Sequence, residues 1–331
     1  MIPRVGVVAI GRNEGERLRV CLESARRDVH ALVYVDSGST DGSVELASTL
    51  GAAIVELDPN VPFTAARARN AGLERLLATW PEVELVQFVD GDCEIEAGWI
   101  EAAAGRLEAE DWVVVCGRRR ERHPEASVYN LLCDMEWDTP VGPAQACGGD
   151  AMMRIAAFRA VGGYADDLIA GEEPELCVRL AARGGRILRL DAPMTIHDAQ
   201  MFAFSQWWTR AKRAGHAVAE AAARHPGFAN GASEREVRSA WVWAAVLPAT
   251  ILLLAVPTHG GALVLALAWP LQILRIAWRR PRPNFPFRDN LLYAAACVVG
   301  KGPHLAGILR FRLGQWTGRR SRLIEYKGVS S

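Results

Sequence analysis

Short apolar runs rich in Val, Ile and aromatic residues recur through the first part of the chain, and segments with helical spacing separate them. This alternation constrains the fold strongly, because parallel strands need long crossover connections, which are usually helical. The helices then cover the sheet. The sequence therefore predicts an α/β fold with a mostly parallel sheet. The expected strands are residues 5–10, 32–35, 52–57, 85–89 and 112–116.

Two helices are well marked between these runs. Within residues 14–27, Leu18, Leu22 and Ala25 share one face of a helix. A second helix is predicted at residues 65–79, with Pro81 marking its end. We place the whole α/β domain at residues 1–225, which is an ordinary size for an enzyme domain.

Two long apolar runs follow, at residues 240–256 and 261–278, and Arg275 is their only charged residue. Each run approaches the roughly 20 residues that cross a bilayer. Basic residues flank the outer ends of the pair, whereas the connecting segment holds no Lys or Arg. The positive-inside rule then predicts a helical hairpin with both outer ends in the cytoplasm. A pair of buried core helices is the alternative interpretation.

A third apolar run, at residues 291–309, is interrupted by Lys301, Pro303 and His304, and we expect an interfacial or re-entrant helix there. These segments form a predicted C-terminal membrane region at residues 226–331. Its last part is basic and suits an anionic surface. The arginines concerned are Arg279, Arg280, Arg282, Arg310, Arg312, Arg319, Arg320 and Arg322.

The overall composition bears on partners and on cellular location. Lys plus Arg and Asp plus Glu each number 38, so the formal net charge is zero and nothing indicates a nucleic-acid partner. The seven cysteines include no C-x-x-C pair, which is typical of buried thiols in a reducing compartment. The start of the chain has no signal-peptide pattern, and we expect the α/β domain to be cytoplasmic.

Two of the predicted strands end in aspartate, at Asp36 and Asp90. Ligands of open α/β sheets bind beyond the carboxyl ends of the strands, so both carboxylates face the expected site. Asp90 is followed by Gly91 and Asp92. Two carboxylates on one tight turn supply the oxygen ligands that Mg²⁺ or Mn²⁺ prefers, although Asp and Gly are also common in turns that bind nothing.

An acidic segment precedes a third predicted helix. Glu172, Glu173 and Glu175 surround Pro174, which suits the first turn of a helix, and acidic residues there also favour the helix dipole. That structural interpretation leaves open why two glutamates precede the helix. Either Glu172 or Glu173 is a candidate general base.

Two further segments are candidates for the site. His197 follows a strand-like run and a turn containing Pro193; a single histidine is more often structural than a metal ligand. A helix beginning near Gln206 carries Arg210 and Arg213, with an aromatic pair that suits core or interface packing.

Taken in order, these segments resemble glycosyltransferase family 2, whose members are inverting enzymes with the Rossmann-like GT-A fold. The resemblance runs from about residue 5 to about residue 213. Residues 35–42 (VDSGSTDG) are similar to the family's V-D-D-G-S-x-D-G segment, and residues 68–72 (ARNAG) to its A-R-N-x-G helix start. Residues 90–92 match the D-x-D motif. Residues 148–150 and 158–164 resemble the acceptor-side segment, and residues 171–176 (GEEPEL) the G-E-D-x-D-L segment.

The resemblance implies a role for each matching residue. Asp90, Asp92 and His197 would bind a divalent cation, Mg²⁺ or Mn²⁺. Glu173 aligns with the catalytic base of the family, but it replaces an aspartate, so Glu172 stays an alternative. The donor-binding residues implied are Ile10, Gly11, Arg12, Glu14, Asp36, Arg69, Asp90, Gly91, Asp92 and Arg210.

The expected activity is therefore inverting transfer of a sugar from a nucleotide-sugar to an acceptor. The hairpin favours a lipid-linked or glycan acceptor at the membrane. The Q-x-x-R-W signature of processive synthases is incomplete here, because no Trp follows Arg210, and this favours transfer of single sugars. The alternatives are a metal-dependent nucleotidyltransferase and an inactive, membrane-tethered binding module.

Overall fold

The computed structural model describes residues 4–279 and 281–318. Arg280, Arg319, Arg320 and Arg322 of the basic segment lie outside the described residues. Contacts divide the chain into two compact units. The first unit comprises residues up to His123 together with Trp137–Gln200, and the second comprises Pro124–Glu136 and the chain from Met201 onward.

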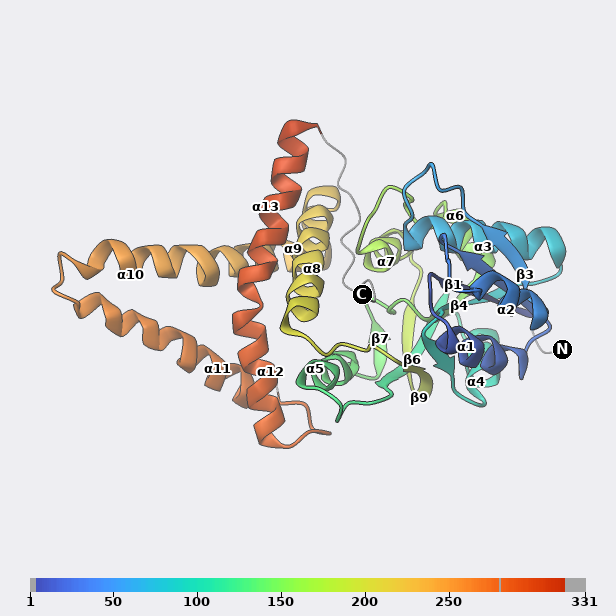
Figure 1. The fold of residues 1–331 in the computed structure, drawn as a ribbon, viewed down its shortest axis with the longest axis horizontal. Helices are drawn as coiled ribbons and strands as arrows, with labels where there is room; N and C mark the ends of the chain where they lie inside the picture. Colours follow the sequence, from blue (N-terminus) through green and yellow to red (C-terminus); the bar gives the residue numbers. More distant parts are fainter. Residues whose placement is uncertain (1–3, 280, 319–331) are drawn as a thin grey trace. The chain divides into compact units, whose positions relative to one another are not determined.

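The first unit is built on one nine-stranded sheet (Figure 1). Its order is β3-β2-β1-β4-β8-β6-β9-β5, with β7 paired to β9. Strands β3, β2, β1 and β4 are mutually parallel, as are β6 and β9, whereas β5, β7 and β8 pair antiparallel with their neighbours. The predicted α/β class with a mostly parallel sheet is confirmed. The strands are β1 Val5–Gly11, β2 Ala31–Asp36, β3 Ala53–Glu56, β4 Leu85–Asp90, β5 Cys93–Ile95, β6 Val114–Glu121, β7 Gly142–Ala144, β8 Ala151–Arg154 and β9 Ile187–His197.

Helices pack against this sheet and bury its apolar strands. The α3 helix lies against β1 and β2, where a Cβ atom on Gly72 would come within 2.3 Å of Val8 Cγ1, so only glycine allows this approach. Strand β2 is buried at every position, as expected for a strand covered on both faces. The helices are α1 Glu16–Arg26, α2 Ser43–Thr49, α3 Ala65–Thr79, α4 Trp99–Ala109, α6 Ile155–Ala160 and α7 Glu172–Ala182.

Two strands differ from the sequence-based prediction. The β6 strand continues to Glu121, and β9 runs through the turn predicted around Pro193 to end at His197. These strands pair in parallel with register shifts between Cys116 and Arg119, and such irregularities let a residue without a backbone N–H lie within a ladder. The longer strands bring Glu121 and His197 to one edge of the sheet.

The second unit is helical. Helices α8 and α13 pack against each other extensively, and their backbones come closest at two glycines. A Cβ atom on Gly215 would lie 2.2 Å from the carbonyl oxygen of His304, and a Cβ atom on Gly307 would lie 2.0 Å from the carbonyl oxygen of Lys212. Small residues of this kind allow close helix packing. The helices are α5 Val128–Trp137, α8 Phe204–Arg224, α9 Phe228–Trp241, a π-helical turn Val242–Val246, α10 Leu247–Ala255, a 3-10 segment Gly261–Leu267, α11 Ala268–Arg279, α12 Phe287–Val299 and α13 Lys301–Thr317.

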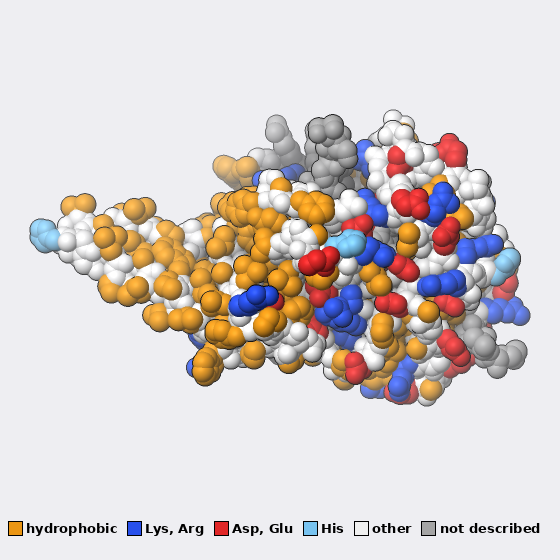
Figure 2. Space-filling model, turned by 60° about the horizontal axis from the view of Figure 1, so that its bottom comes forward, with side chains coloured by type: hydrophobic (Ala, Val, Ile, Leu, Met, Phe, Trp, Pro, Cys, Tyr) orange, Lys and Arg blue, Asp and Glu red, His pale blue; other side chains and the backbone are white. Residues whose placement is uncertain are grey.

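Three helical stretches of the second unit are long and apolar enough to cross a membrane, by length and composition. They are Gly231–Ala255, Gly261–Arg279 and Phe287–Thr317. The first two form the predicted hairpin, and hydrophobic side chains cover it in Figure 2. The third is a candidate span of 31 residues where the sequence predicted an interfacial helix. Large apolar side chains such as Leu252 and Leu253 are about three-quarters exposed, as expected for lipid-facing positions.

Candidate active site at the carboxyl edge of the sheet

The carboxyl ends of three neighbouring strands bring the first group of predicted residues together. In the parallel register, Ile10 lies opposite Asp90, and Gly11 lies opposite Asp36. Strands β6 and β9 run in the same direction as β4, since β8 is antiparallel to both β4 and β6. Glu121 and His197 therefore end on this same edge, where open α/β sheets bind their ligands.

Asp36 is buried and organises the loop that follows β2. Its Oδ2 atom accepts the backbone N–H groups of Gly38 and Ser39 at 2.8 and 2.7 Å, and its Oδ1 atom accepts the Tyr34 hydroxyl at 2.9 Å. The buried carboxylate thus fixes the shape of the β2–α2 loop. Its predicted contact with a donor stays a prediction.

The β1–α1 loop is joined to the β2–α2 loop by side-chain hydrogen bonds. Asn13, which has a positive φ of 53°, accepts the N–H of Thr40, and its own N–H is donated to the Ser39 hydroxyl. Within this loop Arg12 is exposed, with its guanidinium 5.7 Å from the Phe63 ring centroid. Both loops therefore form one connected surface at the sheet edge.

The Asp90–Gly91–Asp92 turn packs directly against the β1 end. Gly91 donates its N–H to the Ile10 carbonyl oxygen at 2.7 Å, and a Cβ atom here would lie only 3.1 Å from that oxygen. The same Cβ would be 3.4 Å from Cγ of Glu14, which is buried and ion-paired to Arg17 at 2.7 Å. A side chain between the two aspartates would therefore be crowded against the end of β1.

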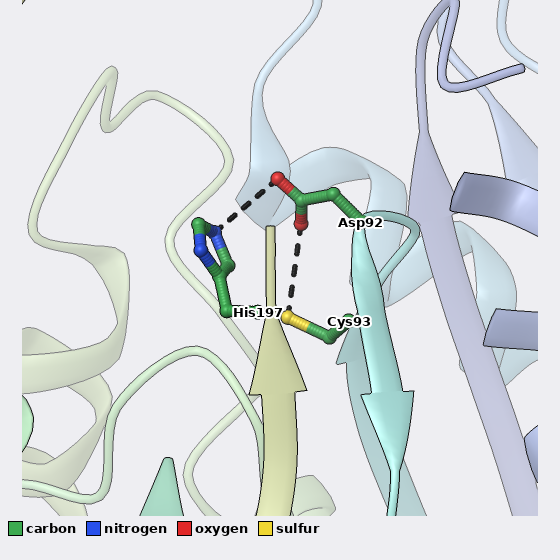
Figure 3. A group of neighbouring side chains, drawn as sticks. All are labelled: Asp92, Cys93 and His197. Atoms are coloured by element: carbon green, nitrogen blue, oxygen red, sulfur yellow. Dashed lines mark hydrogen bonds and ion pairs between the residues drawn. The ribbon is translucent and has the colours of Figure 1, made fainter. Parts of the chain in front are cut away.

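Asp92 lies beside His197, as Figure 3 shows. The Asp92 Oδ2 atom is 3.2 Å from His197 Nε2, and the Cys93 thiol lies 3.7 Å from the other carboxylate oxygen. On the far side of the imidazole, His197 Nδ1 is 3.5 Å from Glu121 Oε2. Burial disfavours the charged imidazolium, but the two carboxylates outweigh it and raise the pKa of His197 above its ordinary value.

Arg69 connects Asp90 to the acidic start of α7. Its guanidinium, only 2% exposed, donates to Asp90 Oδ1 at 2.7 Å and to Glu172 Oε1 at 2.8 Å. Burial lowers the pKa of an arginine, but here the charges of Asp90 and Glu172 raise it. Arg69 therefore stays charged and fixes the distance between β4 and α7.

Glu173 occupies a different environment from Glu172. Its Oε1 atom accepts the backbone N–H of Cys147, and the Cys177 thiol donates to it at 3.1 Å. Among the described residues, no hydrogen bond reaches the Oε2 atom. The side chain is buried, and Oε2 is left to accept a proton.

Two residues of the site, Asp150 and Arg119, were given no role by the sequence analysis. Asp150 is fully buried and accepts the backbone N–H of Asp90 at 3.1 Å and the Thr195 hydroxyl at 2.7 Å. Arg119 lies 2.6 Å from Asp150 Oδ2 and 3.7 Å from Asp90 Oδ2. Only the strand pairing reveals these contacts, although Asp150 stands in a segment that resembles the family motif.

One predicted donor-binding residue belongs to the other unit. Arg210 lies in α8, and its guanidinium contacts Glu136 at 2.6 Å. A role for Arg210 at the donor site stays a prediction.

The residues of this edge fit a divalent cation. Asp92 Oδ2 and His197 Nε2 are separated by about the distance expected of two ligands on one ion, since metal–O and metal–N bonds are about 2.0–2.2 Å. Carboxylates are numerous at this edge: Asp90, Asp150 and Glu172 pair with Arg69 or Arg119, and Asp92 and Glu121 lie beside His197. Hard oxygen ligands with an imidazole suit Mn²⁺ or Mg²⁺.

The comparisons with known proteins agree with this geometry. The model of the family described as "Glycosyl transferase family 2" matches residues 7–155. A curated relative, Glycosyltransferase AglE of Haloferax volcanii, is 22% identical over 214 residues, covering 61% of this chain and 69% of its own. The pre-mycofactocin glycosyltransferase of Mycobacterium tuberculosis is 28% identical over 236 residues, covering 67% of this chain and 48% of its own.

A solved structure shares the fold. The mannosyltransferase PcManGT from Pyrobaculum calidifontis, determined in complex with GDP-Man and Mn²⁺, superposes with a TM-score of 0.58 at 21% identity. The alignment covers 90% of this chain and 87% of that one. Together with the matched family model, this likeness confirms the GT-A fold. The chain is a glycosyltransferase, and its residues 7–155 are similar to family 2.

Proposed function

We propose that this enzyme transfers a sugar, with inversion, from a nucleotide-sugar to a lipid-linked or glycan acceptor at the cytoplasmic face of a membrane. The observation that carries the proposal is the contact of Asp92 with His197 at the carboxyl edge of the sheet. Asp90 ends β4 on the same edge, and Arg69 joins it to Glu172. The Pyrobaculum neighbour, which shares the fold, was determined in complex with GDP-Man and Mn²⁺.

Asp92 and His197, with Asp90, would hold the divalent cation. When bound, a cation of this kind neutralises the charge that develops on a departing nucleoside diphosphate. Arg69 and Arg119 have a separate task in the protein itself. By pairing with Asp90, they fix its carboxylate before any donor arrives, and pre-organisation of this kind lowers the barrier to transfer.

Glu173 is proposed as the general base. The donors to Oε1 hold the carboxylate in place, and Oε2 can take the proton of an acceptor hydroxyl. The deprotonated oxygen would attack the anomeric carbon from the side opposite the leaving nucleotide, which inverts the configuration. Glu172 is better suited to positioning, because its carboxylate is engaged by Arg69.

The membrane setting favours a lipid-linked acceptor. The second unit contains three candidate spans, and its described basic residues include Arg279 and Arg282 at the end of the second. With arginines at the outer ends of the hairpin, the positive-inside rule favours these ends lying in the cytoplasm. A catalytic unit joined to such a region would meet acceptors carried on the inner leaflet.

The test uses the full chain in detergent with a panel of nucleotide-sugars, including GDP-mannose and UDP-glucose. Because a ligand that binds only the folded state raises its stability, we expect one donor to raise the Tm in the presence of Mn²⁺ but not after chelation. Asp92→Asn should remove this shift and the transfer activity, whereas Glu101→Gln, an exposed change on α4, should keep both. Donor-dependent stabilisation that is equal with and without Mn²⁺ would contradict the proposed role of the cation.

A second measurement addresses the stereochemistry. The anomeric configuration of the sugar in the product, read by NMR, should be opposite to that in the donor. Retention of configuration would exclude single displacement assisted by Glu173.

A further inference from the structure

A second group of metal-ligating side chains lies in the first unit and shares no residue with the group of Asp92, Cys93 and His197. The thiols of Cys147 and Cys177 are 3.6 Å apart, and the Cys177 thiol is 3.1 Å from Glu173 Oε1. One ligand atom from each of the three residues lies within 4.8 Å of the other two, and all three residues are buried. We call Cys147, Glu173 and Cys177 the thiol cluster.

The geometry of the thiol cluster is that of a chelate. Glu173 and Cys177 are four residues apart on α7, so their side chains project from one face of the helix, the spacing used by paired metal ligands on helices. Cys147 approaches from the loop before β8. Two thiolates bound to one tetrahedral Zn²⁺ would be about 3.8 Å apart, given Zn–S bonds of about 2.3 Å, and the observed separation is 3.6 Å.

We propose that the thiol cluster is a binding site for a soft divalent cation such as Zn²⁺, with Cys147, Cys177 and Glu173 as ligands. Thiolate ligands select soft ions over Mg²⁺, whereas the oxygen-rich edge around Asp90 favours hard ions. The thiol cluster would therefore prefer soft ions such as Zn²⁺, and the edge around Asp90 would prefer hard ions such as Mg²⁺. This inference deepens the proposed function at one point, because it engages the carboxylate assigned as the base.

A neighbouring hydroxyl supports a ligand at this position. Tyr164 is buried, and its hydroxyl has no hydrogen-bond partner among the described residues. Burial raises the pKa of Tyr164, whose surroundings include Arg69, Cys147 and Glu173. A buried hydroxyl without a partner is costly, and a water molecule on the fourth position of a tetrahedral ion would be a suitable partner for it.

Protons must leave when the cation binds. The pKa of Cys147 is raised by its contact with Cys177 and by burial; for Cys177, burial and the charge of Glu173 outweigh the lowering effect of Cys147. A cysteine binds a cation as its thiolate, so binding by Cys147 and Cys177 releases their thiol protons to solvent. The site should strengthen as the pH rises.

Binding at the thiol cluster would inhibit transfer, since a carboxylate bound to a cation is a poor base. Zn²⁺ should thus oppose the activating Mn²⁺ without competing for Asp92 and His197. Inhibition should persist at saturating Mn²⁺.

The experiment titrates Cd²⁺, a spectroscopic substitute for Zn²⁺, into the full chain and records thiolate-to-metal charge-transfer absorption. One equivalent should produce the band in the wild type and in Cys116→Ser, a matched control in which another buried thiol is removed. Cys147→Ser and Cys177→Ser should each weaken the band at least about tenfold at equal Cd²⁺, as expected when a thiolate ligand is lost. Thermal unfolding confirms that each variant is folded.

One further variant tests the other thiol near a metal site. Cys93 lies beside Asp92 and His197, so a band that is lost in Cys93→Ser but kept in the Cys147→Ser/Cys177→Ser double variant would overturn the proposal. The number of protons released per Cd²⁺ bound can also be measured on the wild type alone. Close to two protons per Cd²⁺ at neutral pH supports two thiolate ligands, and release below one proton per ion contradicts them.

The activity measurement separates this site from the proposed catalytic role. Zn²⁺ should inhibit transfer at saturating Mn²⁺, and Cys177→Ser should raise the inhibiting concentration at least about tenfold. A cluster-dependent Cd²⁺ band without inhibition by Zn²⁺ would leave the cation site in place and remove Glu173 as the base. Absence of the band would refute the site, whatever the activity.

Discussion

His197 Nε2 lies 3.2 Å from Asp92 Oδ2, and the antiparallel pairing of β5 with β9 fixes this distance. In that register Cys93 lies opposite His197. Asp92, the residue just before β5, is therefore next to the end of β9. The pair depends on the sheet and not on flexible loops. Side chains held by strands in this way keep their geometry without a bound ligand.

Glu121→Gln should weaken Mn²⁺ binding. Glu121 Oε2 is 3.5 Å from His197 Nδ1, and carboxylates behind a histidine ligand orient it and raise its basicity. Loss of such a partner typically costs about 10–100-fold in metal affinity. Isothermal titration with Mn²⁺ measures the change. Glu94→Gln is the matched control, because its partner is Arg122 in a partly exposed ion pair, and an unchanged affinity is expected there.

Arg69→Met should destabilise the first unit. The change leaves Asp90 and Glu172 without their buried partner, and breaking a buried ion pair from one side costs about 3–5 kcal/mol. The midpoint of urea unfolding should fall accordingly. Adding Glu172→Gln to this variant should recover part of the loss, since one unpaired charge is then removed. Equal midpoints for Arg69→Met and the wild type would show that the pairs contribute little.

Gly215→Val should separate α8 from α13. The added side chain would overlap the backbone of His304, because even its Cβ atom would lie 2.2 Å from that carbonyl oxygen. We expect lower thermal stability and faster proteolysis of the second unit. Gly105→Ala is the control: it is also a helical glycine, but a Cβ atom there meets nothing within 4 Å. That change should be neutral or stabilise by roughly 0.5–1 kcal/mol.

The stability of the second unit should fall in acid through His216. Burial, with a smaller effect of Arg310, lowers the pKa of this histidine to about 4, and its ring packs on Phe311. Between the ordinary value near 6.5 and about 4, only the unfolded chain takes up the proton, so stability is lost as the pH falls through this window. Below the window no further loss is expected from this group. In His216→Gln the acid-dependent part of the Tm should shrink, and an unchanged profile would assign the pH dependence to other groups.

The sequence was most informative where strands and motifs coincide. Asp36 and Asp90 lie at strand ends, as predicted from apolar runs that stop at a carboxylate, and α3 has the predicted bounds. These features are local, so a single segment contains the signal. His197 was placed near the metal site through its family resemblance alone.

What the sequence could not reveal depends on pairing between distant segments. Strands β5, β7 and β8 have only three or four residues, too few for a recognisable period. Asp150 and Glu121 reach the site because β8 lies beside β4 and because β6 continues past its apolar part. Neither the pairing of β8 with β4 nor the extension of β6 can be predicted from the local sequence.

The course of the chain between the two units determines how the protein can be dissected. Residues Pro124–Glu136 leave the first unit after β6 and return before β7, and the Ser127 hydroxyl and the Asn130 amide oxygen make hydrogen bonds with Met201. A stop codon after Gln200 would delete Met201 but keep residues 124–136, which belong to the second unit. The side chains of Leu132 and Met135, which are buried in the full chain, would then lose part of their surroundings. Soluble fragments cut at that point should aggregate unless residues 124–136 are also replaced by a short polar linker.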